Sequence, residues 1–437
     1  MTCRMKPITS LLIVLLALVV TSSHQRHASA QAFGVELHAN MNPAAGGMGG
    51  VSIARPQDLQ SAFTGNPATL TQFRGTQFSF SGGWVEPTIN ADNGATLPLA
   101  GVGPFEAKSG QPGSALVNIG VTQDFSAFGL PVTWGAALHS GAGLGVKYVA
   151  DPASNGSAAS LLALHSVSGV GVQVTERLSV GTELAITTAA LDGPFSGIGA
   201  NTTAYGIRGL FGATYDTIEH TTLGFYWMTK ESFRFEDAIR ISLGGGAFSL
   251  AQDIQLDLPE TFGWGIANDR LLDGRLLLAS DILYKRYSNT DFFRAIWDDQ
   301  FILQTGLQYQ LTHKIRVRLG YTFAENNMLN ASSLVAGGIL PPDGLPAIQY
   351  LQSQFPSINE HRISGGFGVR NIFPGVDLDV NAGGMFFAKD QFGDSAASVE
   401  SYWVAMGMTW RFGRGACERL PVPDRWCQHS DIGCGLR

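Results

Sequence analysis

Large apolar residues alternate with mostly smaller or polar ones in the segment Tyr402-Trp403-Val404-Ala405-Met406-Gly407-Met408-Thr409-Trp410-Arg411-Phe412. Successive side chains of a β-strand point to opposite faces, so this alternation predicts a strand with two different faces. The segment has 11 residues, whereas strands of globular proteins average about 5–6. A strand that crosses a membrane needs about 9–11 residues. The segment therefore predicts a membrane-spanning strand.

The same alternation recurs along the chain, for example in Gln300 to Leu311 and in Lys314 to Phe323. A soluble β-sandwich would also alternate, but its strands are shorter and its polar face carries more lysine and glutamate. We therefore predict an all-β fold, a transmembrane antiparallel β-barrel of about 14 strands. The expected strands are 77–87, 114–122, 131–140, 158–175, 178–191, 204–216, 221–234, 250–267, 274–287, 300–311, 314–325, 360–372, 376–387 and 399–412.

The connections between these strands alternate in length. Residues 176–177, 312–313 and 373–375 form short connections, whereas 88–113 and 326–359 are long. Outer-membrane barrels have short periplasmic turns and longer outer loops. The alternation therefore predicts a barrel in the bacterial outer membrane.

Composition agrees with this fold class. Only 14% of the 437 residues are charged, 45% are hydrophobic, and mean hydropathy is +0.09. A chain so poor in charge and rich in aromatic residues is not intrinsically disordered. After residue 20 there is no apolar run of about 18 residues, which argues against a bundle of membrane helices.

The first 30 residues have the layout of a cleaved signal peptide. Arg4 and Lys6 precede an apolar run from Ile8 to Val20, and Ala28-Ser29-Ala30 provides small residues before a cleavage site at Gln31. A membrane anchor is the alternative, but the apolar run is short for a span. Removal of three basic residues would change the net charge from −7 to −10. Such an acidic chain is not expected to bind nucleic acid.

Two further segments are expected outside the barrel wall, which spans 77–412. Residues 31–76 show no sustained alternation, and we interpret them as an N-terminal hatch that plugs the lumen; a disordered arm is the alternative. Residues 413–437 are expected to form a periplasmic tail. The tail contains Cys417, Cys427 and Cys434, an odd number that would leave one thiol free or paired between chains. The spacing of these cysteines does not predict a metal site.

Several short motifs follow one another along the chain. They are the glycine-rich run Gly46 to Gly50, Asn66-Pro67-Ala68, Thr133-Trp134-Gly135-Ala136, Leu256-Asp257-Leu258-Pro259-Glu260 and Arg362-Ile363-Ser364-Gly365-Gly366. In this order and spacing they resemble the FadL/TodX family of outer-membrane transporters for long-chain fatty acids and other hydrophobic compounds. The resemblance covers nearly all of 31–412.

The resemblance implies roles for some of these residues. Asn66, Pro67 and Ala68 would belong to the hatch, although Asn66 and Pro67 also suit the start of any short helix. A lateral exit through the wall is implied near Gly135 and Ala136. Pro259 cannot donate to a strand ladder and marks an edge, a bulge or a kink, so we group it with the exit.

The chain departs from the family's pattern in its loops and at its end. The third outer loop, about 192–203, is short, whereas 326–359 is long and apolar. We expect the long loop to take over cargo capture. The tail after Phe412 is the second departure.

Charged residues are expected on the inner face of the barrel near its periplasmic end. They are Arg316, Arg318, Arg370, Arg411, Asp377 and Asp379. A guanidinium can hold a carboxylate through two hydrogen bonds, so Arg316, Arg318 and Arg370 are candidate substrate-binding residues, together with Phe33 of the hatch. The alternative is an ionic girdle in which the arginines and aspartates neutralise one another.

The leading hypothesis is passive uptake of a hydrophobic small molecule through the plugged lumen and out through the wall. A porin-like channel for polar solutes is the alternative. An enzyme is not expected, because the chain lacks common catalytic motifs and its histidines are scattered. No cofactor is expected. The expected partners are the cargo, outer-membrane lipid and lipopolysaccharide, and the barrel-assembly machinery, with the protein a monomer.

Overall fold

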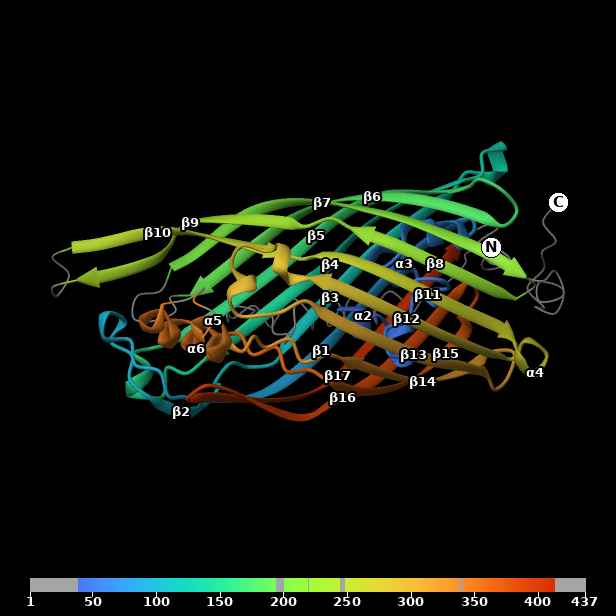
Figure 1. Ribbon diagram of the computed structural model, residues 1–437. Helices are drawn as coiled ribbons and strands as arrows, with labels where there is room; N and C mark the ends of the chain where they lie inside the picture. Colours follow the sequence, from blue (N-terminus) through green and yellow to red (C-terminus); the bar gives the residue numbers. More distant parts are fainter. Residues whose placement is uncertain are drawn as a thin grey trace, which may run out of the picture.

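A computed structural model describes residues 38–412 except 194–199, 219, 244–247, 337, 339 and 340. In this part of the chain, fourteen antiparallel strands form a closed barrel (Figure 1), which confirms the predicted fold class. The ring is closed by pairing of the first strand, β1 (Thr76–Asn93), with the last, β17 (Ser395–Phe412). The other strands of the ring are β3 (Ser114–Asp124), β4 (Val132–Lys147), β5 (Ala158–Gln173), β6 (Leu178–Gly193), β7 (Ala200–Ile218), β8 (Thr221–Met228), β11 (Glu260–Arg270), β12 (Leu276–Arg286), β13 (Gln300–Gln310), β14 (Ile315–Ala324), β15 (His361–Phe373) and β16 (Val376–Phe392).

The two faces of the wall differ as the alternation predicts. On β17, Tyr402 and Val404 are 63% and 50% exposed on the outside, whereas Trp403 and Ala405 are buried inside. An apolar outer face is what a membrane-spanning barrel presents to lipid. None of the helices in the described ranges is long and apolar enough to cross a membrane.

The two ends of the barrel also differ, and we name them by their connections. At the short-turn end, adjacent strands are joined by connections such as Pro374-Gly375, where Gly375 has a φ of 74° that favours glycine. At the long-loop end lie the β9–β10 hairpin and helix α6, which Figure 1 shows on the opposite side from α4. The smaller elements of the wall and loops are β2 (Phe105–Lys108), β9 (Glu231–Leu243), β10 (Phe248–Leu258), α4 (Leu271–Gly274), α5 (Ala331–Ala336), α6 (Leu345–Gln354), η3 (Pro98–Ala100), η4 (Ser126–Phe128), η5 (Pro152–Ser154), η6 (Tyr287–Asn289), η7 (Phe293–Ala295) and η8 (Pro342–Gly344).

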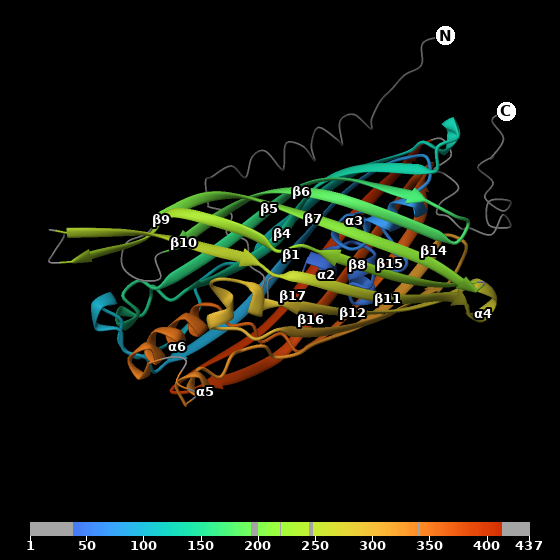
Figure 2. The same ribbon diagram turned by 45° about the horizontal axis from the view of Figure 1, so that its top comes forward.

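Residues 38–75 lie inside the barrel, where Figure 2 shows α2 and α3 surrounded by strands. The elements of this segment are α2 (His38–Met41), η1 (Ala45–Met48), α3 (Leu59–Thr64) and η2 (Pro67–Gln72). Helix α3 begins where the Asp58 carboxylate accepts a hydrogen bond from the Ser61 N–H. Capping of this kind satisfies an N–H that the helix itself leaves without a partner. We call residues 38–75 the inner segment.

The interior at the long-loop end is apolar. One buried cluster there contains Phe233, Phe235, Tyr287, Phe293, Ile296, Trp297 and Phe355 together with small residues of β5, β6 and β7. We call it the outer apolar cluster. The rings of Phe293 and Trp297 stack with centroids 4.4 Å apart, so this end of the lumen is filled by packed side chains.

Candidate functional site

Asp281 of β12 attaches the inner segment to the wall. Its carboxylate accepts hydrogen bonds from the Ser52 N–H at 2.6 Å and the Ile53 N–H at 3.0 Å. Asp281 is 1% exposed, and a buried carboxylate is costly unless it is hydrogen-bonded. Next to it, the Arg55 guanidinium pairs with Asp269 of β11 at 2.7 Å. Two wall carboxylates thus bind one short stretch of the inner segment.

Glycines of the wall make room for this stretch. A Cβ added at Gly265 would lie 2.7 Å from the Ile53 Cβ, and one at Gly224 would lie 2.4 Å from the Ile53 carbonyl oxygen. Glycine within a strand often marks a site of close backbone approach. The side chain of Ile53 packs there against Leu210 and Tyr226. This fit leaves Ile53 in a recess that larger wall residues would fill.

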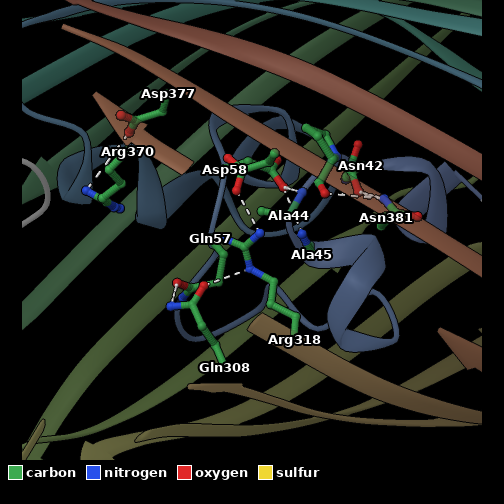
Figure 3. A network of polar contacts seen from close by, with 12 residues as sticks. Asn42, Ala44, Ala45, Gln57, Asp58, Gln308, Arg318, Arg370, Asp377 and Asn381 are labelled. Carbon is green, nitrogen blue, oxygen red and sulfur yellow. Dashed lines mark hydrogen bonds and ion pairs between the residues drawn. The ribbon is translucent and has the colours of Figure 1, made fainter. Parts of the chain in front are cut away.

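A second polar network fixes the beginning of the inner segment (Figure 3). The Asn381 side-chain amide of β16 donates to the Asn42 carbonyl oxygen at 2.7 Å. The second Asp58 oxygen accepts from the N–H groups of Ala44 and Ala45, both at 2.8 Å. The Gln308 amide of β13 donates to Gln57 at 2.9 Å. Residues 42–58 therefore hold their shape through directional contacts.

The predicted hatch motif takes part in the same architecture. Asn66 accepts from the Ala68 N–H at 3.0 Å, and Pro67 is the first residue of η2, as expected for a helix start. The Asn66 amide also donates to the Ile53 carbonyl oxygen at 2.8 Å and to the Ala213 carbonyl oxygen of β7 at 3.0 Å. The same asparagine thus caps a helix and ties two parts of the inner segment to the wall.

The predicted arginines and aspartates come together at the short-turn end. Arg318 binds Asp379 at 2.6 Å, and Arg411 binds Asp377 at 2.7 Å. Arg370 lies 4.0 Å from Asp377, and Figure 3 shows this pair beside the inner segment. Arg316 lines a cavity of about 40 Å³ together with the other three arginines and both aspartates. A cavity of this size holds water rather than an alkyl chain, and this geometry favours the ionic girdle. The fourth candidate binding residue, Phe33, lies outside the described residues.

The wall has a gap in its hydrogen bonding between β3 and β4. The ladder runs from Asp124–Thr133 to Asn118–His139 and then stops. Towards the long-loop end, β3 pairs only with β1, and β4 only with β5 across a bulge at Ser140–Ala142. We call this gap the β3–β4 seam. At its edge the rings of His139 and His165 stack with centroids 5.0 Å apart.

The predicted exit residues lie near this seam but not in it. Gly135 and Ala136 are regularly paired with Thr122 and Val121 of β3. A Cβ at Gly135 would lie 2.8 Å from the Phe63 ring of the inner segment, so the glycine accommodates Phe63. Pro259 separates β10 from β11, five strands along the wall from β4. The structure therefore does not bring Pro259 together with Gly135 and Ala136.

The long loop 326–359 packs over the long-loop end of the lumen. The Tyr148 hydroxyl donates to the Ser353 carbonyl oxygen at 3.1 Å, and the Ser157 and Tyr350 hydroxyls are 2.6 Å apart. Burial raises the pKa of Tyr350 to about 12, so it remains a neutral hydroxyl at ordinary pH. The Trp297 indole N–H donates to the Phe355 carbonyl oxygen at 3.0 Å. Helix α6 is thereby tied to the outer apolar cluster.

Sequence reasoning missed Asp281 and Asp269. The only signal available was that Asp281 falls on the inner face of a predicted strand, where an unpaired acid is unusual. Its partners Ser52 and Ile53 lie 229 and 228 residues away. No local pattern connects residues so far apart.

The fold matches solved structures of known barrels. The Pseudomonas putida toluene transporter TodX has a TM-score of 0.62 at 16% identity, covering 88% of this chain and 100% of that one. A Pseudomonas aeruginosa FadL homologue has a TM-score of 0.62 at 14% identity, covering 88% and 99%. The Ralstonia pickettii toluene transporter TbuX has a TM-score of 0.58 at 17% identity, covering 84% and 98%. No family model and no curated protein sequence matches the chain.

Proposed function

We propose that this protein is a member of the FadL/TodX family and carries hydrophobic small molecules passively across the bacterial outer membrane. The fold that it shares with toluene transporters supports this proposal. The observation that carries it is the filled lumen: the inner segment contacts strands around the ring, and packed aromatic side chains occupy the long-loop end. A water-filled channel has no use for either feature, whereas apolar cargo gains about 0.8 kcal/mol per buried CH₂.

The inner segment acts in this proposal as the hatch. The stretch 31–37, the signal peptide 1–30 and the tail 413–437 all lie outside the described residues, so their roles remain predictions. Signal-directed export, assembly by the barrel-assembly machinery, contact with lipopolysaccharide and a monomeric state are part of the same proposal. From here on we call residues 38–75 the hatch.

The route begins at α6 and the outer apolar cluster and ends at the wall. We place the lateral exit at the β3–β4 seam, between the end of the ladder at His139 and the hydrogen bond from the Gly110 N–H to the Lys147 carbonyl oxygen, because the two strands share no ladder there. The seam lies on the long-loop side of Phe63 and Gly135. Cargo that passes there meets lipid rather than water, and its apolar surface stays covered throughout.

The arginines at the short-turn end serve structure rather than cargo in this proposal. Their partners Asp377 and Asp379 already neutralise much of their charge. Removing one partner of a buried pair leaves an uncompensated charge, which is strongly destabilising. The girdle therefore holds the barrel together on the short-turn side of the hatch.

Electrical conductance distinguishes a hatch-filled transporter from a porin. We expect full-length protein in planar bilayers to conduct little, and a variant lacking residues 31–75 to conduct strongly. Arg234→Gln is the matched control, since Arg234 lies on the exposed face of the β9–β10 hairpin. Large conductance by the full-length protein would overturn the proposal.

Cargo is tested directly by native mass spectrometry of detergent-purified protein. A bound apolar molecule should co-purify, and added toluene or dodecanoate should compete for its place. A protein that retains no apolar ligand and admits neither probe into proteoliposomes faster than empty vesicles would contradict hydrophobic uptake.

A further inference from the structure

The wall has a second interruption, between β7 and the β9–β10 hairpin. The ladder between β7 and β8 ends at Leu210–Met228. In the described part of the chain, β9 and β10 then pair only with each other, while β7 continues beside β6 as far as Ala200. The edge of β7 that faces the hairpin therefore has no strand ladder from Ala200 to Arg208.

The base of the hairpin has the geometry of a hinge. The β8–β11 ladder ends at Met228–Thr261, and the β9–β10 ladder begins at Glu231–Leu258. Thr229 and Lys230 thus lie opposite Pro259 and Glu260, so both chains leave the ladder at the same level. Proline cannot supply the missing N–H. The interruption is therefore built into the sequence.

Arg208 of β7 holds both chains of this hinge. Its Nε donates to the Thr229 carbonyl oxygen at 3.2 Å, and its Nη2 donates to the Pro259 carbonyl oxygen at 3.1 Å. Its Nε also lies 3.9 Å from a carboxylate oxygen of Glu231. Arg208 is 4% exposed. A planar guanidinium with donors in a fixed fork can bind both carbonyls at once, whereas a lysine ammonium is a point charge on a flexible stem.

The hairpin covers an apolar surface formed by small residues. Phe233 and Phe235 of β9 are fully buried in the outer apolar cluster, together with Ala189 of β6 and Ala204 of β7. A Cβ at Gly206 of β7 would lie 2.5 Å from the Phe233 ring. The side chains of the wall are thus small where the hairpin side chains that pack on them are large. If the hairpin moved away, the space that Phe233 and Phe235 now fill would become an open apolar cavity of similar size.

We propose that the base of the β9–β10 hairpin is a hinged flap in the wall, pinned closed by Arg208. Release of the pin lets Glu231 to Phe235 and Ile254 to Leu258 swing away from β7. This opens the outer apolar cluster to apolar molecules of about the size of one aromatic ring. The use of the flap for cargo rests on the proposed function, but the hinge itself does not.

Hydrogen–deuterium exchange of the full-length protein in detergent tests the hinge without any cargo. We compare the wild type with Arg208→Gln and Arg208→Lys, and with Arg234→Gln as a control on the exposed face of the same hairpin. Arg208→Gln should raise exchange at the hairpin base, in 231–235 and 254–258, at least tenfold and leave β12 to β16 unchanged. Arg208→Lys should give a smaller rise, because one ammonium cannot replace the fork.

A second variant, with the opposite expected effect on exchange, keeps the test valid if Arg208→Gln fails to fold. Pro259→Ala restores a backbone N–H to the interruption and should slow exchange at the hairpin base. Unchanged exchange at the base in the Arg208 variants, an increase spread over the whole barrel, or equal loosening by Arg234→Gln would overturn the hinge. Failure of the transport assays with a positive exchange result would refute the proposed function and leave the hinge standing.

Discussion

The hatch has two halves, and the first half makes more hydrogen bonds and ion pairs to the wall than the second. Residues 38–58 are held by hydrogen bonds and ion pairs from strands between β11 and β16, led by Asp281 and Asn381. Residues 59–73 pack Leu59, Ala62, Phe63, Leu70 and Phe73 against small residues of β4, β5 and β6. The first half borders the strands that carry the girdle residues, and the second half borders the β3–β4 seam.

The difference indicates which half can move. Hydrogen bonds are directional and weaken steeply when their angle changes, whereas apolar contact depends mainly on the area removed from water. Displacing the second half by a given distance therefore costs less free energy than displacing the first half by the same distance. We expect the hatch to pivot on Ser52 and Ile53 and to yield next to the seam.

The largest expected effect comes from the packed half. Phe63→Ala empties a site between Gly120 and Gly135, and removal of a buried phenylalanine ring costs about 3–5 kcal/mol. Hydrogen exchange should rise steeply in 59–73 and little in 42–54. Phe80→Ala, at a lipid-facing position that is 46% exposed, is the control. Equal loosening of both halves would mean that the hatch moves as one body.

A smaller effect is expected from the anchor. Asp281→Asn removes the charge that accepts from Ser52 and Ile53, and hydrogen bonds to charged groups contribute about 1.5–3 kcal/mol. The Ser52 and Ile53 amides should exchange faster, by roughly tenfold to a hundredfold. Asp253→Asn on the exposed hairpin is the control. If Asp281→Asn raised amide exchange more in 59–73 than in 52–54, Asp281 would not hold the pivot of the hatch.

A weaker effect is expected at the neighbouring ion pair. Asp269→Asn releases Arg55 and His220, but Asp269 is 21% exposed, and such pairs contribute about 0–1 kcal/mol. Exchange at 52–55 should change several-fold less than in Asp281→Asn. Equal effects of the two variants would show that charge, rather than the two backbone hydrogen bonds, sets the anchor.

The smallest effect is expected from Glu183, an inward-facing acid of β6 near the packed half. It is 3% exposed, and its carboxylate has no hydrogen-bond partner among the described residues. Replacing an unsatisfied polar group with an apolar one of similar shape is neutral or stabilising. Glu183→Leu should raise the melting temperature slightly or leave it unchanged, while Glu400→Leu at an exposed site should not raise it. A clear loss would reveal a role for this acid.

Most of the wall could be predicted from the sequence, because alternation is a local property of each strand. Twelve of the fourteen expected strands each correspond to one strand of the ring in the described residues, and the strand directions correctly brought Arg318 close to Asp379. The break in the wall at Met228–Glu231 was missed: we expected 221–234 and 250–267 as continuous strands. Pro259 was its one visible signal.

The contacts of the hatch could not be predicted in the same way. Asp281 and Ser52 are brought together by the closed ring and not by any local pattern. The lateral exit was expected near Gly135, Ala136 and Pro259 and stays a prediction; the structure shows that the β3–β4 ladder ends at His139. A glycine in a strand has more than one use, and the sequence alone does not distinguish a kink from room for Phe63.

Closure of the ring by β1 and β17 bears on how the chain is assembled. This pairing joins residues more than 300 positions apart, from Thr76–Phe412 to Asp92–Ala396, and loop-closure entropy makes such distant pairing slow. The hatch immediately precedes β1 and touches strands on every side of the ring. Its complete surroundings exist only after the last strand has been made. We therefore expect a chain truncated before Ser395 to lose the ordered structure of the hatch as well as its last strand.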